Sequence, residues 1–343
     1  MKEQEIIHIP VTILTGFLGA GKTTFLNHLL EKNQGTRYAI IENEFGEQGV
    51  DNELVLRPEE TSIVELNNGC LCCTLNDNLY DILNELFDRR SEFDEIIIEG
   101  TGVADPTGLA EPFIAHPLIK KHFPLKAIIC LVDAELVEDH IVETEEAKNQ
   151  IAFSDILLIN KVDLVSEDYV LGLKNKLQSI NPLATIVQGQ EGHFPEITYA
   201  VDDSKLENLL LGLAKIKPLN PSEESFPVHK PHHHHHHHHT QDINSHTFNF
   251  EHPLDFQLLH QQLLVYLTFQ ATGLYRIKGL ICFADKEEQY LLQSVGKRMD
   301  FKVQRNWKPG EPKRSTIVFI GKNLQRGGLE KMLNRCIAAP AKG

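Results

Sequence analysis

The chain has 343 residues, which is enough for two domains, and its formal net charge is −15 at pH 7. This acidic balance argues against non-specific nucleic-acid binding, which needs cationic patches that face phosphates. No apolar run approaches the roughly 20 residues of a membrane span, and residues 1–16 lack the basic start and long apolar stretch of a signal peptide. We therefore expect a cytoplasmic protein that acts without nucleic acid or membrane partners.

Residues 1–216 are predicted to form one α/β domain, because short apolar runs alternate with helical patterns along this part of the chain. Such alternation predicts a mostly parallel, doubly wound sheet with helices on both faces. The predicted strands cover residues 11–15, 38–41, 62–66, 95–99, 127–132, 156–160 and 184–187. The predicted helices cover residues 22–31, 75–89 and 168–179.

Residues 217–245 interrupt this pattern with a stretch that is rich in proline and polar residues. Such a composition offers little to bury and predicts a flexible linker. The linker contains eight consecutive histidines, His232–His239, and neutral imidazoles bind zinc, nickel or copper. Residues 246–338 then predict a smaller α+β domain, with helices at 254–269 and 328–337 and strand patterns between them.

The sequence "GFLGAGKTT" directly follows the first predicted strand and matches the phosphate-binding pattern GxxxxGK[ST]. Glycines in this pattern let backbone N–H groups turn toward phosphate oxygens, and the helix that follows adds its N-terminal dipole. Lys22 is expected to reach the β- and γ-phosphates, and the Thr23 hydroxyl to ligate magnesium. The predicted nucleotide-binding residues of this loop are Gly16, Gly19, Ala20, Gly21, Lys22, Thr23 and Thr24.

A second element, "EIIIEGTG", ends the predicted strand at 95–99 with a carboxylate. We expect Glu99 to lie beside the magnesium ion and to act with Lys22 and Thr23 in catalysis, either directly or through a metal-bound water. Most proteins with this phosphate loop carry an aspartate at that place, and glutamate is one methylene longer. Gly102 follows three residues later and is expected to contact the nucleotide.

A third element, "NKVD", ends the predicted strand at 156–160. The Asp163 carboxylate can accept hydrogen bonds from N1–H and the N2 amine of guanine, a pair that adenine does not offer. Asn160 can brace the loop, and the stem of Lys161 can lie over the base. The three elements together predict a protein that binds GTP and GDP.

The sequence "NNGCLCCTLND" places three of the six cysteines within four positions. A reducing cytosol disfavours a disulfide, and a redox couple more often has the spacing CxxC. Cys70, Cys72 and Cys73 offer most of a tetrahedral thiolate site at the start of a predicted helix, which suits zinc, with cobalt or nickel as alternatives. The other cysteines, Cys130, Cys282 and Cys336, are expected to be small buried apolar residues.

A further metal ligand is available in "IENEFGEQGVD", which leaves the strand after the phosphate-loop helix. GTPases carry a nucleotide-sensing segment at this place. Glu42 and Glu47 are the candidate ligands, whereas Glu44 and Asp51 are expected to be solvated.

The sequences "TGFLGAGKTT", "IENEFGE", "NGCLCC", "IEGTGVADP" and "NKVDL" together resemble the CobW-type metallochaperone GTPases, which are related to the urease and hydrogenase nickel chaperones. The sequences "YRIKGLICF" and "STIVFIG" extend the resemblance into that family's C-terminal domain. It implies GTP hydrolysis coupled to delivery of a divalent metal, here predicted to be zinc, to a client metalloprotein. The resemblance also implies that the histidine tract collects metal and that two copies can pair around nucleotide.

Other functions stay open at this point. The chain could deliver cobalt or another divalent metal, or it could buffer or store metal, with nucleotide incidental. The complete set Lys22, Thr23, Glu99 and Asp163 argues against storage, which needs no guanine selectivity. A nucleotide-dependent regulator that docks a partner through its basic residues between 297 and 314 is a further alternative.

Overall fold

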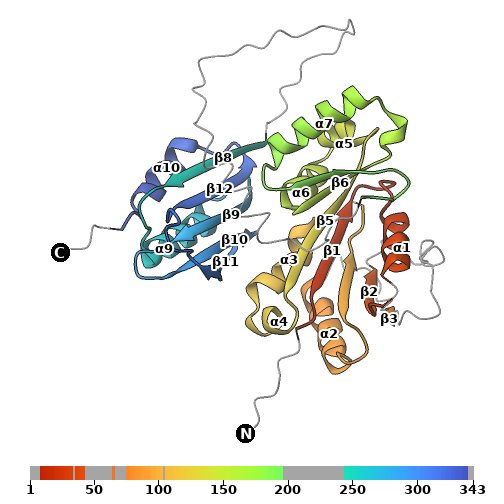
Figure 1. The fold of residues 1–343 in the computed structure, drawn as a ribbon, viewed down its shortest axis with the longest axis horizontal. Helices are drawn as coiled ribbons and strands as arrows, with labels where there is room; N and C mark the ends of the chain where they lie inside the picture. The colour runs from red at the N-terminus through yellow and green to blue at the C-terminus, as the bar shows by residue number, and fades with distance from the viewer. Residues whose placement is uncertain are drawn as a thin grey trace, which may run out of the picture.

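A seven-stranded parallel sheet, in the order β3-β2-β4-β1-β5-β6-β7, forms the first unit of the computed structural model (Figure 1). The structure describes residues 8–33, 35–42, 64–65, 75–102, 105–195 and 243–338. The strands are β1 (Val11–Gly16), β2 (Tyr38–Glu42), β3 (Val64–Glu65), β4 (Glu95–Glu99), β5 (Leu125–Asp133), β6 (Ile156–Asn160) and β7 (Thr185–Gln188). Each neighbouring pair in this sheet is parallel, which confirms the predicted fold class.

Helices cover both faces of this sheet, because its strands bury side chains on both sides. In β1, Val11 and Ile13 pack into one core, with Leu83 and Phe113, while Leu14 packs into another with Phe25. The α-helices are α1 (Lys22–Lys32), α2 (Leu75–Asp88), α3 (Pro106–Ala115), α4 (Pro117–His122), α5 (Val137–Glu143), α6 (Glu145–Phe153) and α7 (Glu167–Ile180).

The segment between β4 and β6 contains helices that the sequence patterns did not predict. Pro106 and Pro117 occupy the first positions of α3 and α4, where a missing N–H costs nothing, and Asp105 caps α3 by accepting from the Thr107 N–H at 2.9 Å. A further proline, Pro112, lies inside α3. Prolines normally interrupt a helical pattern, so periodicity alone was a poor guide here.

The second unit is a five-stranded antiparallel sheet in the order β11-β10-β9-β12-β8, with two helices in its described residues. Its elements are β8 (Ile243–Phe250), α9 (Phe256–Phe269), β9 (Leu274–Cys282), β10 (Glu288–Val295), β11 (Arg298–Asn306), β12 (Ser315–Lys322) and α10 (Arg326–Asn334). The predicted α+β class is confirmed, although β8 begins inside the stretch expected to be linker. The histidine tract lies outside the described residues.

The two units are joined by a buried carboxylate, Asp155, at the start of β6. Its Oδ1 accepts from Arg276 Nη2 at 2.6 Å and from Lys278 Nζ at 2.8 Å, and both cations lie on β9. Its Oδ2 accepts from the Ile128 N–H at 3.0 Å. Burial opposes ionisation, but Coulombic attraction to the two cations outweighs it and holds the pKa of the Asp155 carboxyl well below its usual range.

More ion pairs lie along the same boundary, where α3 and α6 face the second sheet (Figure 1). Arg298 of β11 contacts Glu111 of α3 at 3.2 Å, and Lys322 of β12 contacts Glu145 of α6 at 3.2 Å. These pairs are more exposed than Asp155 and contribute less stability. Among the described helices, none is long and apolar enough to cross a membrane.

Replacing Asp155 by alanine should destabilise the protein by about 3–5 kcal/mol, because it leaves two cations buried without their carboxylate. The folded-state pKa of Asp155 is depressed, so its contribution is present above the unfolded-state pKa of about 3.9 and is lost as the pH falls through the folded-state value. Urea unfolding of Asp155→Ala and of the unmodified protein should therefore show a gap at pH 7 that narrows only below about pH 4.

The exposed Asp285 provides the control, and Asp285→Ala should change the unfolding free energy by less than about 0.5 kcal/mol. Equal urea midpoints for Asp155→Ala and the unmodified protein at pH 7 would contradict this account of the boundary.

Candidate nucleotide site

The phosphate loop lies between the end of β1 and the start of α1, as the sequence predicts. Gly21 caps α1 with φ of 98°, a left-handed conformation that favours glycine. A Cβ at this position would lie 2.5 Å from Asn160 Nδ2, so a larger residue would have to displace the Asn160 side chain. The helix start has no side-chain cap and no acidic residue in its first turn. A helix start of this kind favours an anion through its N–H groups and its dipole.

Lys22 folds back over this loop, and its Nζ donates to the Gly16 carbonyl oxygen at 3.0 Å. Thr23 is half-buried, and Thr24 is exposed. The ammonium group thus lies against the loop that would wrap the phosphates. A glycine cap, a first helical turn without acidic residues, a lysine across the loop and a hydroxyl at Thr23 fit a magnesium-bound nucleoside triphosphate.

The second element reaches the same place from β4, which lies between β1 and β2. The Cα atoms of Glu99 and Leu14 are register partners, so Glu99 ends its strand beside the start of the phosphate loop. Gly102 is buried, and a Cβ there would lie 2.5 Å from the Leu18 backbone nitrogen. Its carbonyl oxygen accepts from Gln150 Nε2 at 3.2 Å. The segment after β4 is therefore packed directly on the loop.

The third element joins this site through the buried side chain of Asn160. Its Nδ2 donates to the Ala20 carbonyl oxygen at 3.0 Å, and its Oδ1 accepts from the Gly192 N–H at 3.1 Å. One amide thus ties the end of β6 to the phosphate loop and to the turn after β7. Through these two contacts Asn160 can brace the loop.

Lys161 adopts a left-handed conformation, with φ of 60°, and its Nζ donates to Asp133 Oδ2 at 2.7 Å. Asp133 ends β5 as the register partner of Asn160, and its Oδ1 accepts from the Glu135 N–H at 2.9 Å. These contacts fix the Lys161 backbone that leads to Asp163. The Asp163 carboxylate lies on the exposed surface of the 3-10 turn Val162–Leu164, where it can face a base.

Two parts of the site were not predicted from the sequence. Asp133 anchors Lys161, but its role depends on the register of β5 with β6. The turn Gly189–His193 supplies the Gly192 N–H that Asn160 binds, and the Gly189 N–H donates to the Ile159 carbonyl oxygen at 2.8 Å. The glycine-containing "GQEG" after the last predicted strand was the available signal for this turn.

Most of the predicted metal ligands cannot be placed in the structure. Cys70, Cys72, Cys73 and Glu47 lie outside the described residues, as do Glu44 and Asp51. Glu42 is the last residue of β2, and its Cα is the register partner of Glu99. Among the described residues, no three His, Cys, Asp or Glu side chains form a metal site.

The three described cysteines are buried, as predicted. Burial raises the pKa of the Cys130 thiol to about 12 and that of the Cys336 thiol to about 11. Burial also raises the pKa of Cys282. A thiol must lose its proton to bind zinc, so these cysteines are unsuited to the task.

The exposed carboxylate of Asp163 should select guanine over adenine. Asp163→Asn replaces one of the two acceptor oxygens with an NH2 donor and should weaken GTP and GDP binding by ~1–3 kcal/mol through a mismatched polar contact. Isothermal titration with GDP, GTP and ATP measures this directly. Asp168→Asn, on the exposed first turn of α7, is the control and should bind GDP like the unmodified protein. ATP bound by the unmodified protein as tightly as GTP would contradict the assignment.

Comparison with known proteins supports this reading of the site. Residues 10–188 match the family model "CobW/HypB/UreG, nucleotide-binding domain", and residues 243–337 match "Cobalamin synthesis protein cobW C-terminal domain". The zinc chaperone YjiA of Escherichia coli is 33% identical over 320 residues, which cover 92% of this chain and 95% of that protein. The zinc chaperone CobW of Pseudomonas aeruginosa is 32% identical over 361 residues, which cover 96% and 92%.

The solved structure of Zn(II)-bound YjiA GTPase from Escherichia coli has a TM-score of 0.64 to this structure, at 28% identity, covering 96% of this chain and 99% of that one. Both family models thus match in order, and the relatives align over nearly their whole length. The chain is a P-loop GTPase of the CobW/HypB/UreG family that carries the CobW C-terminal domain.

Proposed function

We propose that this protein hydrolyses GTP and uses the change of nucleotide state to deliver zinc to a client metalloprotein. The observation that carries the proposal is the register of β2 with β4, in which Glu42 and Glu99 are Cα partners at the carboxyl ends of their strands. A predicted zinc ligand and a predicted magnesium-side carboxylate thus end neighbouring strands. Relatives that align over most of this chain are named zinc chaperones, which favours zinc over cobalt or another divalent metal.

Hydrolysis would use the groups around the phosphate loop. Lys22 leaves the Gly16 carbonyl oxygen to bind the β- and γ-phosphates, and Thr23 and Glu99 hold the magnesium ion. Magnesium held by Thr23 and Glu99 would supply positive charge that offsets the negative charge of the phosphates. Asp163 binds the guanine edge, while Asn160 keeps the base side and the phosphate side at a fixed spacing.

The position of the cysteines in the chain supports a zinc site near Glu42 and Glu99. They follow β3, which is a parallel neighbour of β2, and they precede α2, which begins at Leu75. Because parallel strands end at one edge, the segment from Glu65 to Leu75 starts at the edge where Glu42 and Glu99 lie. We infer that Cys70, Cys72 and Cys73 bind zinc there, with Glu42 or Glu47 as a further ligand.

The remaining parts of the proposal concern supply and partners. His232–His239 would collect loosely bound metal and pass it to the thiolates. Zinc transfer through free thiolates requires a reducing compartment, which the cytoplasm provides. The partners are the client protein and, in the nucleotide-bound state, a second copy of this chain.

The zinc and nucleotide sites should be thermodynamically coupled, because the two proposed sites share one segment of the chain. Each ligand would favour the conformation of that segment to which it binds best. Titrating zinc into protein that lacks residues 232–239, with GDP and with a non-hydrolysable GTP analogue, should give affinities that differ about 10–100-fold, or ~1.4–2.7 kcal/mol. We expect the weaker affinity after hydrolysis. Nucleotide affinity should change by the same factor when zinc is bound.

Cys72→Ser should abolish tight zinc binding and leave GTP binding largely intact. Cys336→Ser is the matched control, since the buried Cys336 thiol is unsuited to zinc, and it should keep the tight site. Equal zinc affinities in the two nucleotide states would eliminate the delivery function and leave a metal buffer. Loss of all tight zinc binding on deletion of 232–239 would instead show that the histidines, and not the cysteines, form the tight zinc site.

A further inference from the structure

The turn that supplies the Gly192 N–H has a demanding backbone conformation. Glu191 and Gly192, its two central residues, both have positive φ, 51° and 75°, as a type I′ turn requires. The flanking residues Gln190 and His193 exchange two backbone hydrogen bonds, of 3.2 and 2.8 Å. A non-glycine residue with positive φ is costly unless its surroundings hold it. Glu191 therefore needs contacts from outside the turn.

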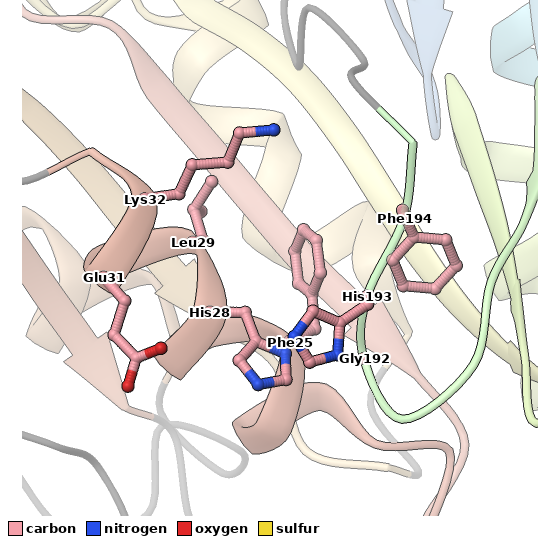
Figure 2. Close-up of a pocket in the computed structure, with 8 residues that line it drawn as sticks. All are labelled: Phe25, His28, Leu29, Glu31, Lys32, Gly192, His193 and Phe194. Carbon is pink, nitrogen blue, oxygen red and sulfur yellow. The ribbon is translucent and has the colours of Figure 1, made fainter.

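Aromatic rings provide such contacts between the turn and α1. The His193 ring lies over the His28 ring, with centroids 3.6 Å apart and planes inclined by 35°. Phe194 meets Phe25 edge to face, with centroids 5.8 Å apart. Figure 2 shows the rings of His28 and His193 meeting across the gap between α1 and the turn, with Phe194 following on the turn.

The contact lies one helical turn beyond the phosphate-binding end of α1. A Cβ at Gly192 would lie 3.0 Å from Thr24 Cγ2 and 3.0 Å from the Phe25 backbone nitrogen, so the turn rests directly on the first turn of this helix. The two histidines, with Phe25 and Phe194, line a pocket of about 290 Å³. The turn is thus held both by the rings of α1 and by Asn160.

We propose that His28 and His193 are positioning residues for guanine-nucleotide binding. Their ring contact holds the turn so that the Gly192 N–H meets Asn160, and Asn160 in turn holds the Ala20 carbonyl oxygen and the strand end that leads to Asp163. Neither histidine touches the nucleotide. The role rests on the guanine site of the proposed function and adds two residues that none of its sequence motifs contains.

The contact acts through Asn160, which holds both the phosphate loop and the strand end that leads to Asp163, so its loss should affect GDP and GTP alike. His193→Ala and His28→Ala should each weaken binding of both nucleotides about 3–10-fold, the range expected for loss of one aromatic contact. The KM for GTP should rise in proportion, while kcat at saturating GTP stays within twofold. The double variant should be no weaker than either single variant, because each removes the same contact.

His193→Phe, which keeps a flat ring, should restore most of the affinity. His260→Ala removes a histidine that contacts Phe256 on α9, far along the chain, and is the matched control with unchanged GDP binding. Stopped-flow dissociation of a fluorescent GDP analogue and steady-state GTP hydrolysis, both with the full chain, provide the measurements.

Unchanged KM in both alanine variants, or additive losses in the double variant, would overturn the proposal. A role through a bound metal would also overturn the proposal. In that case EDTA would lower the GDP affinity of the unmodified protein, added magnesium would not restore it, and His193→Phe would not restore binding. If the unmodified protein binds no guanine nucleotide, the proposed function itself fails. That result differs from a failure of the histidine proposal, in which the unmodified protein still binds GDP.

Discussion

The nucleotide site depends on one buried amide, that of Asn160. It donates to the Ala20 carbonyl oxygen and accepts from the Gly192 N–H at the same time, and an amide offers a donor and an acceptor on separate atoms. In the sheet, β5 lies between the strand that leads to the phosphate loop and the strand that ends at Asn160. Because β1 and β6 are not neighbours, backbone hydrogen bonds between strands do not join their ends, and the Asn160 side chain makes this connection instead.

The strand between them contributes as well. Asp133 ends β5 and accepts a hydrogen bond from Lys161, which follows β6. Together with the bond from Asn160 to the phosphate loop after β1, this contact links the ends of three adjacent strands, β1, β5 and β6. The carboxyl ends of parallel strands are where open α/β sheets place their ligands. Here that edge carries a phosphate loop, a base loop and, through β2 and β4, the pair of acidic residues Glu42 and Glu99.

Local sequence was sufficient for the buried strands. The strands Ile156–Asn160 and Glu95–Glu99 form at their predicted bounds. A continuous apolar run rich in isoleucine and leucine is typical of a strand in a parallel sheet that is covered on both faces. The phosphate loop was also predictable, since its glycines and lysine act within one short segment. The roles of Asp133 and of the turn around Gly192 were not predictable, because they arise from register and from contacts between residues far apart in the chain.

The helices α3 to α6 were missed for a different reason. They are short, and prolines begin two of them, so their stability comes from packing against the sheet and the second unit. The cysteine segment lies outside the described residues, so its assignment rests on the sequence pattern and on the strands that flank it.

The partners in the ion pair at Asp155 are synthesised at different times. Asp155 and Arg276 are 121 positions apart, so at about 5–20 residues per second a ribosome needs about 6–24 s to make the chain between them. During this interval β6 can already pair with β5, and the carboxylate that will be buried still faces water. Its cationic partners arrive only with β9, after the histidine tract has been made. The nascent GTPase domain therefore exists for seconds without its C-terminal partner, and a chain cut short in the linker would keep this carboxylate hydrated at what is otherwise a buried boundary.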